Sequence, residues 1–273
     1  MDASSIRPAA VVGTFYPAEP ETLKVQVEEY LQEAADSQTE TLPATAPKAI
    51  IAPHAGYIYS GPIAGSVYSR LRPWSDKIKR VMLIGPSHRV PFDGLATSSA
   101  EFFITPLGKI PLDCEAIGQL LTLPQVSEID EAHRLEHSLE VHLPFLQETL
   151  DAFTLVPLVF GRTQAEAIAE VLEQVWDDTE TLIVVSSDLS HYHDYQEASA
   201  MDKKAAQAIE NLAPEALNSE QACGQLAICA VLLAAKRHGL QARMLDLRNS
   251  GDTAGDKDRV VGYGAFEFSQ IAG

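Results

Sequence analysis

The stretch Leu182–Asp188, with the sequence LIVVSSD, decides the fold class together with three similar stretches, Ala49–Pro53 (AIIAP), Val81–Ser87 (VMLIGPS) and Leu155–Gly161 (LVPLVFG). Each is a short apolar run that ends in Gly, Pro or polar residues, which is typical of buried parallel strands. Between them, Thr163–Trp176 and Gln196–Leu212 carry apolar residues at helical spacing. Strands that alternate with helices predict an α/β fold.

Further segments predict that the central sheet is mixed but largely parallel. Gly94–Asp113 has the character of a β-hairpin around Pro106-Leu107-Gly108, and Arg243–Asn249 with Val260–Phe268 resemble two late strands. An amphipathic helix at Thr22–Ala35 is followed by a Pro- and Thr-rich loop at Thr39–Pro47. No internal repeat is visible, so we expect one domain over residues 1–273, with helices flanking the sheet.

The charge of the chain excludes several classes of partner. With 38 acidic and 20 basic residues, the net charge of -18 repels phosphate backbones and anionic lipid surfaces, so we expect no nucleic acid and no membrane partner. No apolar run approaches the roughly 20 residues that span a bilayer. The N-terminus, MDASSIRPAAVVG, lacks the basic and apolar regions of a signal peptide. We therefore predict a cytoplasmic protein.

The three cysteines, Cys114, Cys223 and Cys229, form no CxxC pair, which argues against a disulfide framework and a structural zinc site. Gln221–His238 is predicted to be a buried helix, in which Cys229 packs in the core. Cys223 precedes Gly224 at the start of this helix, where the positive helix end is expected to stabilise a thiolate. The residues alone leave open whether Cys223 is functional or simply buried.

Three histidines follow three of the predicted strands. His54 comes after the first, His88 after the second and His191 after the fourth. Because ligands of α/β sheets bind outside the carboxyl ends of the strands, we expect one polar, histidine-rich pocket centred on His54 and His88. Two imidazoles with a third donor are typical of a redox or hydrolytic transition-metal centre. A single histidine of this kind would more often be a surface or hydrogen-bonded core residue.

The segment Glu136–His142, with the sequence EHSLEVH, resembles helical zinc motifs. On a helix, however, His137 and His142 would lie roughly 140° apart, so they are not expected to hold one metal together. His137 and Glu140 would share a face and point into the pocket, beside the metal or against a substrate. The alternative is a helix N-terminal segment with solvated charges.

Asp188 and His191 have a spacing at which a carboxylate orients an imidazole and raises its basicity, which suits a general base. The alternative is that Asp188 or Ser190 caps the next helix. A serine hydrolase is less well supported, because the sequence around Ser87 lacks the second glycine of a nucleophile elbow.

Motifs over nearly the whole chain resemble the Memo family, whose prokaryotic members are called AmmeMemoRadiSam system protein B. The matching stretches are Gly13-Thr14-Phe15-Tyr16-Pro17, Ala52-Pro53-His54-Ala55-Gly56-Tyr57, Gly85-Pro86-Ser87-His88, Glu136–Pro144, Ser186-Ser187-Asp188, Cys223-Gly224 and Gly262-Tyr263-Gly264-Ala265. The resemblance implies a fold related to the class III extradiol dioxygenases, which hold a non-haem iron with two histidines and a glutamate.

The resemblance also implies a ligand set. His54 and His88 match the two histidine ligands, and Cys223 matches a cysteine that the Memo family has at the third position. A thiolate in place of a carboxylate makes the site softer, favouring Cu(I) or a differently tuned iron, with zinc as a further candidate. His191 falls in the region where the dioxygenases carry an acid–base histidine. Phe15 and Tyr59 resemble aromatic residues that line the family's pocket.

Two functions follow as hypotheses. The first is a metal-dependent oxidoreductase related to the dioxygenases, in which His191 and Asp188 handle protons and an unknown small molecule or peptide contacts Phe15, Tyr59, His137, Glu140 and His142. The second is a non-enzymatic binding module that uses the same pocket for a peptide or small ligand. Animal members are implicated in binding phosphotyrosine segments, and the prokaryotic name suggests a pathway with a radical enzyme. A homo-oligomer is left open.

Overall fold

The computed structural model describes residues 6–38, 42–43, 45–176 and 179–270. Part of the predicted loop at Thr39–Pro47 therefore lies outside the described residues. A larger and a smaller sheet form the framework, and the four apolar stretches of the sequence are the parallel centre of the larger one. In sheet order they are β2 (Ala49–Ala52), β9 (Thr181–Ser186), β3 (Arg80–Pro86) and β8 (Thr154–Phe160).

Antiparallel strands extend both sides of this parallel centre, as a mixed sheet requires. On one side β12 (Val260–Gln270) pairs with β2, and β11 (Leu240–Asn249) and β10 (His191–His193) pair with β12. On the other side β4 (Leu95–Thr97) runs antiparallel to β8, and β7 (Val126–Glu128) pairs with β4. The two late strands are thus confirmed, and so is the α/β class with a mixed, largely parallel sheet.

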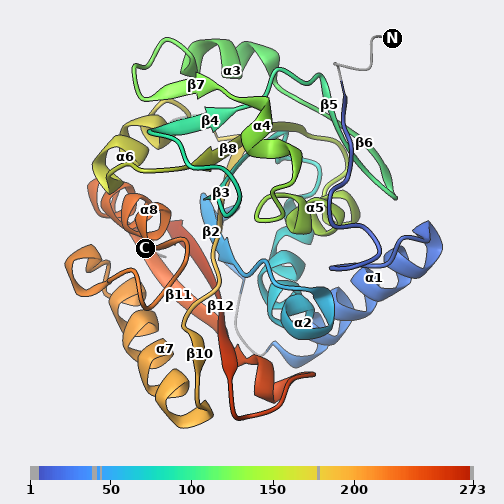
Figure 1. The fold of residues 1–273 in the computed structure, drawn as a ribbon, viewed down its shortest axis with the longest axis vertical. Coiled ribbons are helices and arrows are strands. Elements are labelled where there is room, and N and C mark those ends of the chain that lie inside the picture. Colours follow the sequence, from blue (N-terminus) through green and yellow to red (C-terminus); the bar gives the residue numbers. More distant parts are fainter. Residues whose placement is uncertain (1–5, 39–41, 44, 177–178, 271–273) are drawn as a thin grey trace.

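The smaller sheet contains the predicted hairpin. Its strands β5 (Phe102–Thr105) and β6 (Gly108–Pro111) are antiparallel, and the N-terminal β1 (Ile6–Arg7) adds to β5. This pairing places the N-terminal segment beside β5, at the edge of the smaller sheet (Figure 1).

Helices cover both faces of the larger sheet (Figure 1). One face carries α6 (Ala165–Glu173), α7 (Tyr195–Glu210) and α8 (Gln225–Arg237). The other carries α2 (Tyr57–Tyr68), with α1 (Pro20–Ser37) and α5 (Leu143–Thr149) packed outside it. The described residues also form the short helices α3 (Cys114–Leu120) and α4 (Asp130–Arg134) and 3-10 turns at Ser69–Trp74, Glu140–His142, Pro214–Ala216 and Ser250–Asp252.

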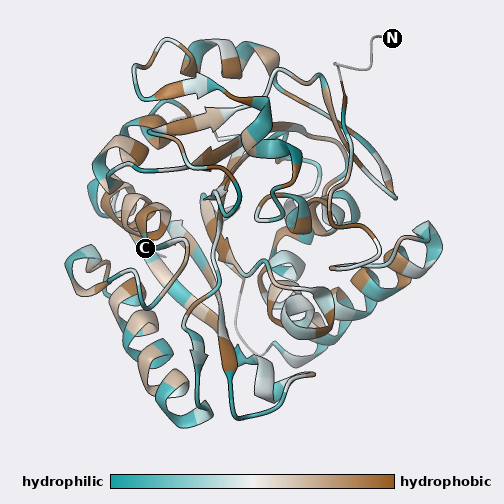
Figure 2. Ribbon diagram, viewed as in Figure 1, coloured by the Kyte–Doolittle hydropathy of each residue, from teal (hydrophilic) through white to brown (hydrophobic). Residues whose placement is uncertain are grey.

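Helix α2 has no polar face, because it lies between α1 and the sheet. Apolar residues surround the parallel strands, and the polar residues lie on the outer faces of the helices (Figure 2). Within α2, a Cβ atom added at Gly65 would lie 2.6 Å from the carbonyl oxygen of Tyr30 on α1. Glycine at this position therefore lets the two helices approach closely.

Among the described residues, no helix is both long enough and apolar enough to cross a membrane.

Candidate metal centre

The parallel pairing of β2, β9 and β3 brings three polar loops to one edge of the sheet. His54, Asp188 and His88 each follow two residues after the end of β2, β9 and β3 respectively. Because these strands are parallel and adjacent, their carboxyl ends meet. The rings of His54 and His88 are 5.2 Å apart between centroids. The predicted pairing of these two histidines is present.

Cys223 completes this group. It lies just before α8, and its Sγ is 3.4 Å from Nε2 of His54. One donor atom from each of His54, His88 and Cys223 lies within 4.8 Å of the other two, as in a group that can hold a metal ion. His54 is 2% exposed, whereas the His88 side chain is 31% exposed, so solvent reaches the group at His88 but not at His54.

Ser186 determines the tautomer of His54. Its Oγ donates a hydrogen bond to the carbonyl oxygen of Ser138 at 2.5 Å and lies 2.6 Å from Nδ1 of His54. Since a serine hydroxyl has one proton, Oγ must accept from His54, which places the ring proton on Nδ1. The lone pair of Nε2 is then free to bind a metal, beside Cys223.

Glu136 has the corresponding role for His88. Its Oε1 lies 2.9 Å from Nδ1 of His88, and Oε2 accepts from the backbone N–H of His88 at 2.6 Å. Although burial opposes ionisation, the hydrogen bonds from His88 and from the backbone of Ser138 lower the pKa of Glu136 to about 2. An ionised Glu136 accepts the Nδ1 proton of His88 and leaves its Nε2 as a metal-binding atom.

The buried groups of the site favour neutral imidazoles and a protonated thiol. Burial, with the neighbouring imidazoles of His88 and His137, holds the pKa of His54 well below its usual value. Burial and the carboxylate of Asp188 raise the pKa of Cys223 to about 12. Without a bound cation, burial therefore outweighs the expected stabilisation of a Cys223 thiolate by the end of α8. A bound cation would have to displace the thiol proton.

Asp188 lies against His54. Its Oδ1 accepts from the backbone N–H of His54 at 2.7 Å, and its Oδ2 is 4.0 Å from Nε2 of that residue. Burial raises the pKa of Asp188. The residue that caps α7 is Asp194, whose side chain accepts from the N–H groups of Gln196 and Glu197, so the alternative of a cap at Asp188 or Ser190 is wrong.

His191 is half-buried on β10 and pairs with Val261 of β12. The next residue, Tyr192, has a φ of 64°, which is uncommon for a residue with a side chain, so the backbone turns sharply at this point. The role of His191 as a base stays a prediction.

His137 and His142 have different surroundings, as the sequence indicates. The ring of His137 is 5.5 Å from that of His54, 4.6 Å from that of His88 and 4.9 Å from that of Phe15. His142 is 1% exposed, and its Nδ1 is 2.9 Å from the hydroxyl of Tyr68. The structure thus brings Phe15 and His137 to the candidate metal centre, whereas His142 is bonded within the core.

Glu140 contacts the N-terminal segment. It is fully buried, forms an ion pair with Arg7, and accepts from the hydroxyl of Tyr16 at 2.5 Å and from the N–H of Val11 at 3.0 Å. The alternative of solvated charges over 136–142 is wrong, because Glu136, Glu140 and His142 are all buried. The contacts of Glu140 favour a role in holding the N-terminal segment over the predicted substrate contact. Tyr59 is half-buried at the start of α2.

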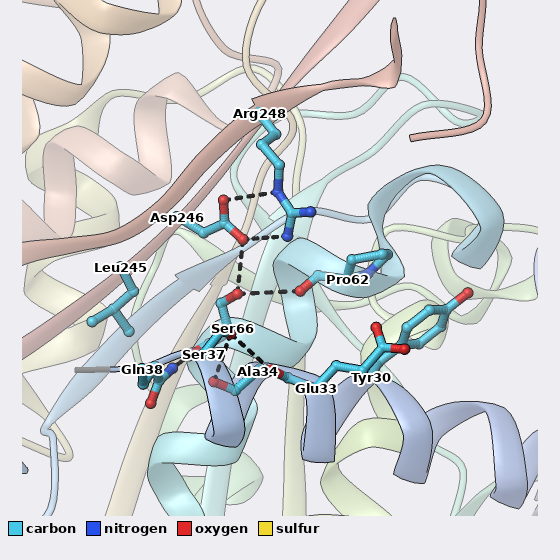
Figure 3. A pocket seen from close by; sticks show the side chains of 10 residues that line it. All are labelled: Tyr30, Glu33, Ala34, Ser37, Gln38, Pro62, Ser66, Leu245, Asp246 and Arg248. Atoms are coloured by element: carbon cyan, nitrogen blue, oxygen red, sulfur yellow. Dashed lines mark hydrogen bonds and ion pairs between the residues drawn. The ribbon is translucent and has the colours of Figure 1, made fainter. Parts of the chain in front are cut away.

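A separate cavity of about 530 Å³ lies between α1, α2 and β11 (Figure 3). In it, Asp246 accepts a hydrogen bond from Oγ of Ser66 at 2.8 Å and pairs with Arg248. Its lining is formed by residues outside the predicted site, so we assign it no part in the proposed chemistry.

The comparisons with known proteins agree with the resemblance of the motifs. A family model described as Memo-like protein matches residues 7–267. A MEMO1 family protein of Ignicoccus hospitalis is 36% identical, over 96% of this chain and 98% of its own length. MEMO1 family proteins of Archaeoglobus fulgidus and Aquifex aeolicus are 34% and 35% identical, over 96% and 94% of this chain and 99% and 97% of their own lengths. The chain belongs to the Memo family.

Proposed function

We propose that this Memo-family chain binds an iron or copper ion through His54, His88 and Cys223 and carries out redox chemistry on a small molecule or peptide. The observation that carries the proposal is that Oγ of Ser186 and Oε1 of Glu136 lie 2.6 and 2.9 Å from Nδ1 of His54 and His88, respectively. These contacts favour a proton on each Nδ1, which leaves both Nε2 atoms for a metal. Two imidazoles and a thiolate suit a transition metal, and the thiolate favours Cu(I) or iron over harder cations. The ion would supply a change of oxidation state.

The residues around the ligands have defined tasks in this proposal. Phe15 and His137 lie in ring contact at the centre, where they would pack against a substrate. Asp188 would hold or release a proton next to His54, because its buried carboxyl has a raised pKa. His191 would exchange a proton with the substrate. The same aromatic contact also fits a ligand-binding module without catalysis, which is the second candidate.

Metal analysis of full-length protein purified without oxygen tests the metal-binding part. We expect His54→Ala, His88→Ala and Cys223→Ser to lose most of the iron or copper that the wild type carries. The matched controls are His193→Ala, whose ring is paired with Glu197 on the surface, and Cys114→Ser, an exposed thiol. Both should retain the metal. Equal iron and copper contents in all six proteins would refute the proposal.

Redox activity separates the two candidates. We expect the loaded wild type to show a reversible change in electron paramagnetic resonance when a mild reductant and then oxygen are added. Cys223→Ser should lose this change. A loaded protein that does not change oxidation state, and that binds peptides equally well with and without a chelator, would favour the binding module.

A further inference from the structure

A second group of candidate ligands adjoins the first and shares one residue with it. One donor atom from each of His88, Glu136 and His137 lies within 4.8 Å of the other two. Oε1 of Glu136 is 2.9 Å from Nδ1 of His88 and 3.3 Å from Nδ1 of His137. His88 therefore has one ring nitrogen toward Glu136 and His137, and its other nitrogen is available to the group that contains His54 and Cys223.

Nδ1 of His137 faces Oε1 of Glu136 at 3.3 Å without forming a hydrogen bond that would account for its burial. Its Nδ1 is inaccessible to solvent and makes no hydrogen bond to any described residue. Its ring nevertheless stacks on that of His88, with 24° between the planes, so it is held in place. A buried polar atom without a partner is costly unless something binds to it. Nδ1 of His137 is thus a fixed donor atom beside the carboxylate of Glu136.

The distances between these donors fit one small cation. Two donors bound at about 2.0–2.1 Å lie about 2.9 Å apart at a right angle and about 3.4 Å apart at a tetrahedral angle. The separations of 2.9 and 3.3 Å from Oε1 of Glu136 fall within this range. Two imidazoles and a glutamate are also the ligand set of catalytic zinc sites, harder than a set that includes a thiolate.

We propose that His88, Glu136 and His137 form a second cation site, selective for a divalent ion of the zinc type, which shares the His88 ring with the first site. When only this site is filled, the cation takes the place of the Nδ1 proton of His88, which moves to Nε2. When both sites are filled, that proton leaves to solvent and His88 bridges the two ions as an imidazolate. The inference goes beyond the proposed function. The two sites have only His88 as a common ligand, so the second ion binds whether or not Cys223 is a ligand.

Titration of metal-free, full-length protein with Co²⁺ under anaerobic conditions tests this inference. Bound Co²⁺ gives visible absorption in either site, whereas a thiolate-to-metal charge-transfer band reports the Cys223 site alone. We expect two equivalents in the wild type, one of them with the charge-transfer band. His137→Ala should keep the equivalent with the band and weaken binding of the other by more than about 100-fold, a larger effect than loss of an outer residue. Cys223→Ser should lose the equivalent with the band and keep the other.

Three further variants complete the design. His88→Ala should weaken both equivalents, and His193→Ala, a surface histidine, should weaken neither. Glu136→Gln removes a different ligand of the second site and should also weaken the equivalent without the band. Circular dichroism establishes that each variant is folded. A single equivalent with the charge-transfer band in the wild type overturns the second site and preserves the first. A single equivalent without that band overturns the thiolate site and preserves the second. Two equivalents unaffected by His137→Ala and Glu136→Gln also overturn this inference.

Discussion

Two side chains, Ser186 and Glu136, hold the protons of the candidate ligands in place. Ser186 is directed by the carbonyl of Ser138, and Glu136 by the backbone N–H groups of residues 88, 137 and 138. A ring that is free to rotate or to change tautomer would lose affinity each time its bare nitrogen turned away. In the proposed function, the metal affinity of His54 and His88 would therefore depend on residues that are not themselves ligands of the first site.

Replacing Ser186 with alanine tests this dependence. Without its hydroxyl, Nδ1 of His54 loses its acceptor, and the proton is free to move to Nε2. We expect a 10- to 100-fold loss of metal affinity, the usual effect of removing an outer hydrogen bond, while the fold is retained. Competition with a chromogenic chelator measures the affinity. Ser66→Ala, at a serine bonded to Asp246, is the matched control and should leave affinity unchanged.

Because His133 is buried, we predict that the folded protein loses stability in mild acid. Burial lowers its pKa to about 4 in the folded protein, against about 6.5 in the unfolded chain. Between these values the unfolded state binds more protons, so stability falls as the pH decreases from about 6.5 to about 4. At about 1.4 kcal/mol per unit, the loss amounts to a few kcal/mol.

Urea unfolding at a series of pH values measures this loss. His133→Gln should reduce the slope in that range, although the buried His142, whose pKa is lowered to about 3, still contributes in the same direction. A slope identical to that of the wild type would contradict the assignment to His133.

The sequence indicated the candidate metal ligands better than the residues that orient them. The positions of His54 and His88 after two predicted strands indicate that they belong to the site. Only the family motif indicates that Cys223 belongs to it. Glu136 lies in the segment Glu136–His142, which resembles a helical motif in sequence. The chain instead forms a turn there, before a 3-10 helix at Glu140–His142. Ser186 lies in a stretch that matches the family, but nothing in the sequence indicates its role, because a serine at the end of a buried strand differs from its neighbours only after the fold brings Ser138 to it.

At the scale of elements, the approach of α8 to the end of β9 sets the position of Cys223. The N–H of Gly224 donates to Oγ of Ser187 at 2.9 Å, and the N–H of Cys223 donates to the carbonyl of Asp188 at 3.3 Å. A Cβ atom at Gly224 would lie 2.6 Å from the carbonyl oxygen of Ser186. The helix can begin this close to the strand only because residue 224 has no side chain.

Gly224→Ala should therefore move the start of α8 and Cys223 with it. We expect a loss of about 1–3 kcal/mol of stability from overpacking and weaker metal binding. Gly118→Ala, at an exposed position of α3 with nothing within 4 Å, is the control and should gain about 0.5–1 kcal/mol. Thermal unfolding and chelator competition measure both effects. Equal stability of the two variants would contradict the proposed contact.

The regular elements were predictable where one periodicity dominates. The four apolar stretches coincide with β2, β3, β8 and β9 to within two residues at each end, and the late strands and α1 were also present. Helix α2 was not predicted, because it is buried on nearly all sides and contains Gly61, Pro62 and Gly65, which break the amphipathic pattern. Its helical state depends on packing between α1 and the sheet, which only the folded chain provides.

For the molecule as a whole, the site joins segments that are far apart in the chain. Its ligands follow β2, follow β3 and precede α8, and Phe15 reaches it from the N-terminal segment. A metal held by such distant segments binds the folded state and not the unfolded chain. Metal binding should consequently stabilise the entire fold.

We therefore predict that bound metal raises the melting temperature of the protein. Free metal at about 100 times its dissociation constant adds about 2.7 kcal/mol to stability, which corresponds to a rise of about 5–10 °C for a protein of this size. A chelator should reverse the rise, and Cys223→Ser should show less of it. Scanning calorimetry with and without the ion measures the effect. An unchanged melting temperature under saturating metal would contradict binding between these segments.

X-ray absorption spectroscopy of full-length protein, purified without oxygen and loaded with one equivalent of copper or iron, tests the central claim most directly. With His54, His88 and Cys223 as ligands, we predict one sulfur scatterer at about 2.3 Å and imidazole nitrogens at about 2.0 Å. The sulfur contribution should disappear in Cys223→Ser and persist in Cys114→Ser. A spectrum of the wild type without sulfur, or without imidazole scattering, would contradict the account.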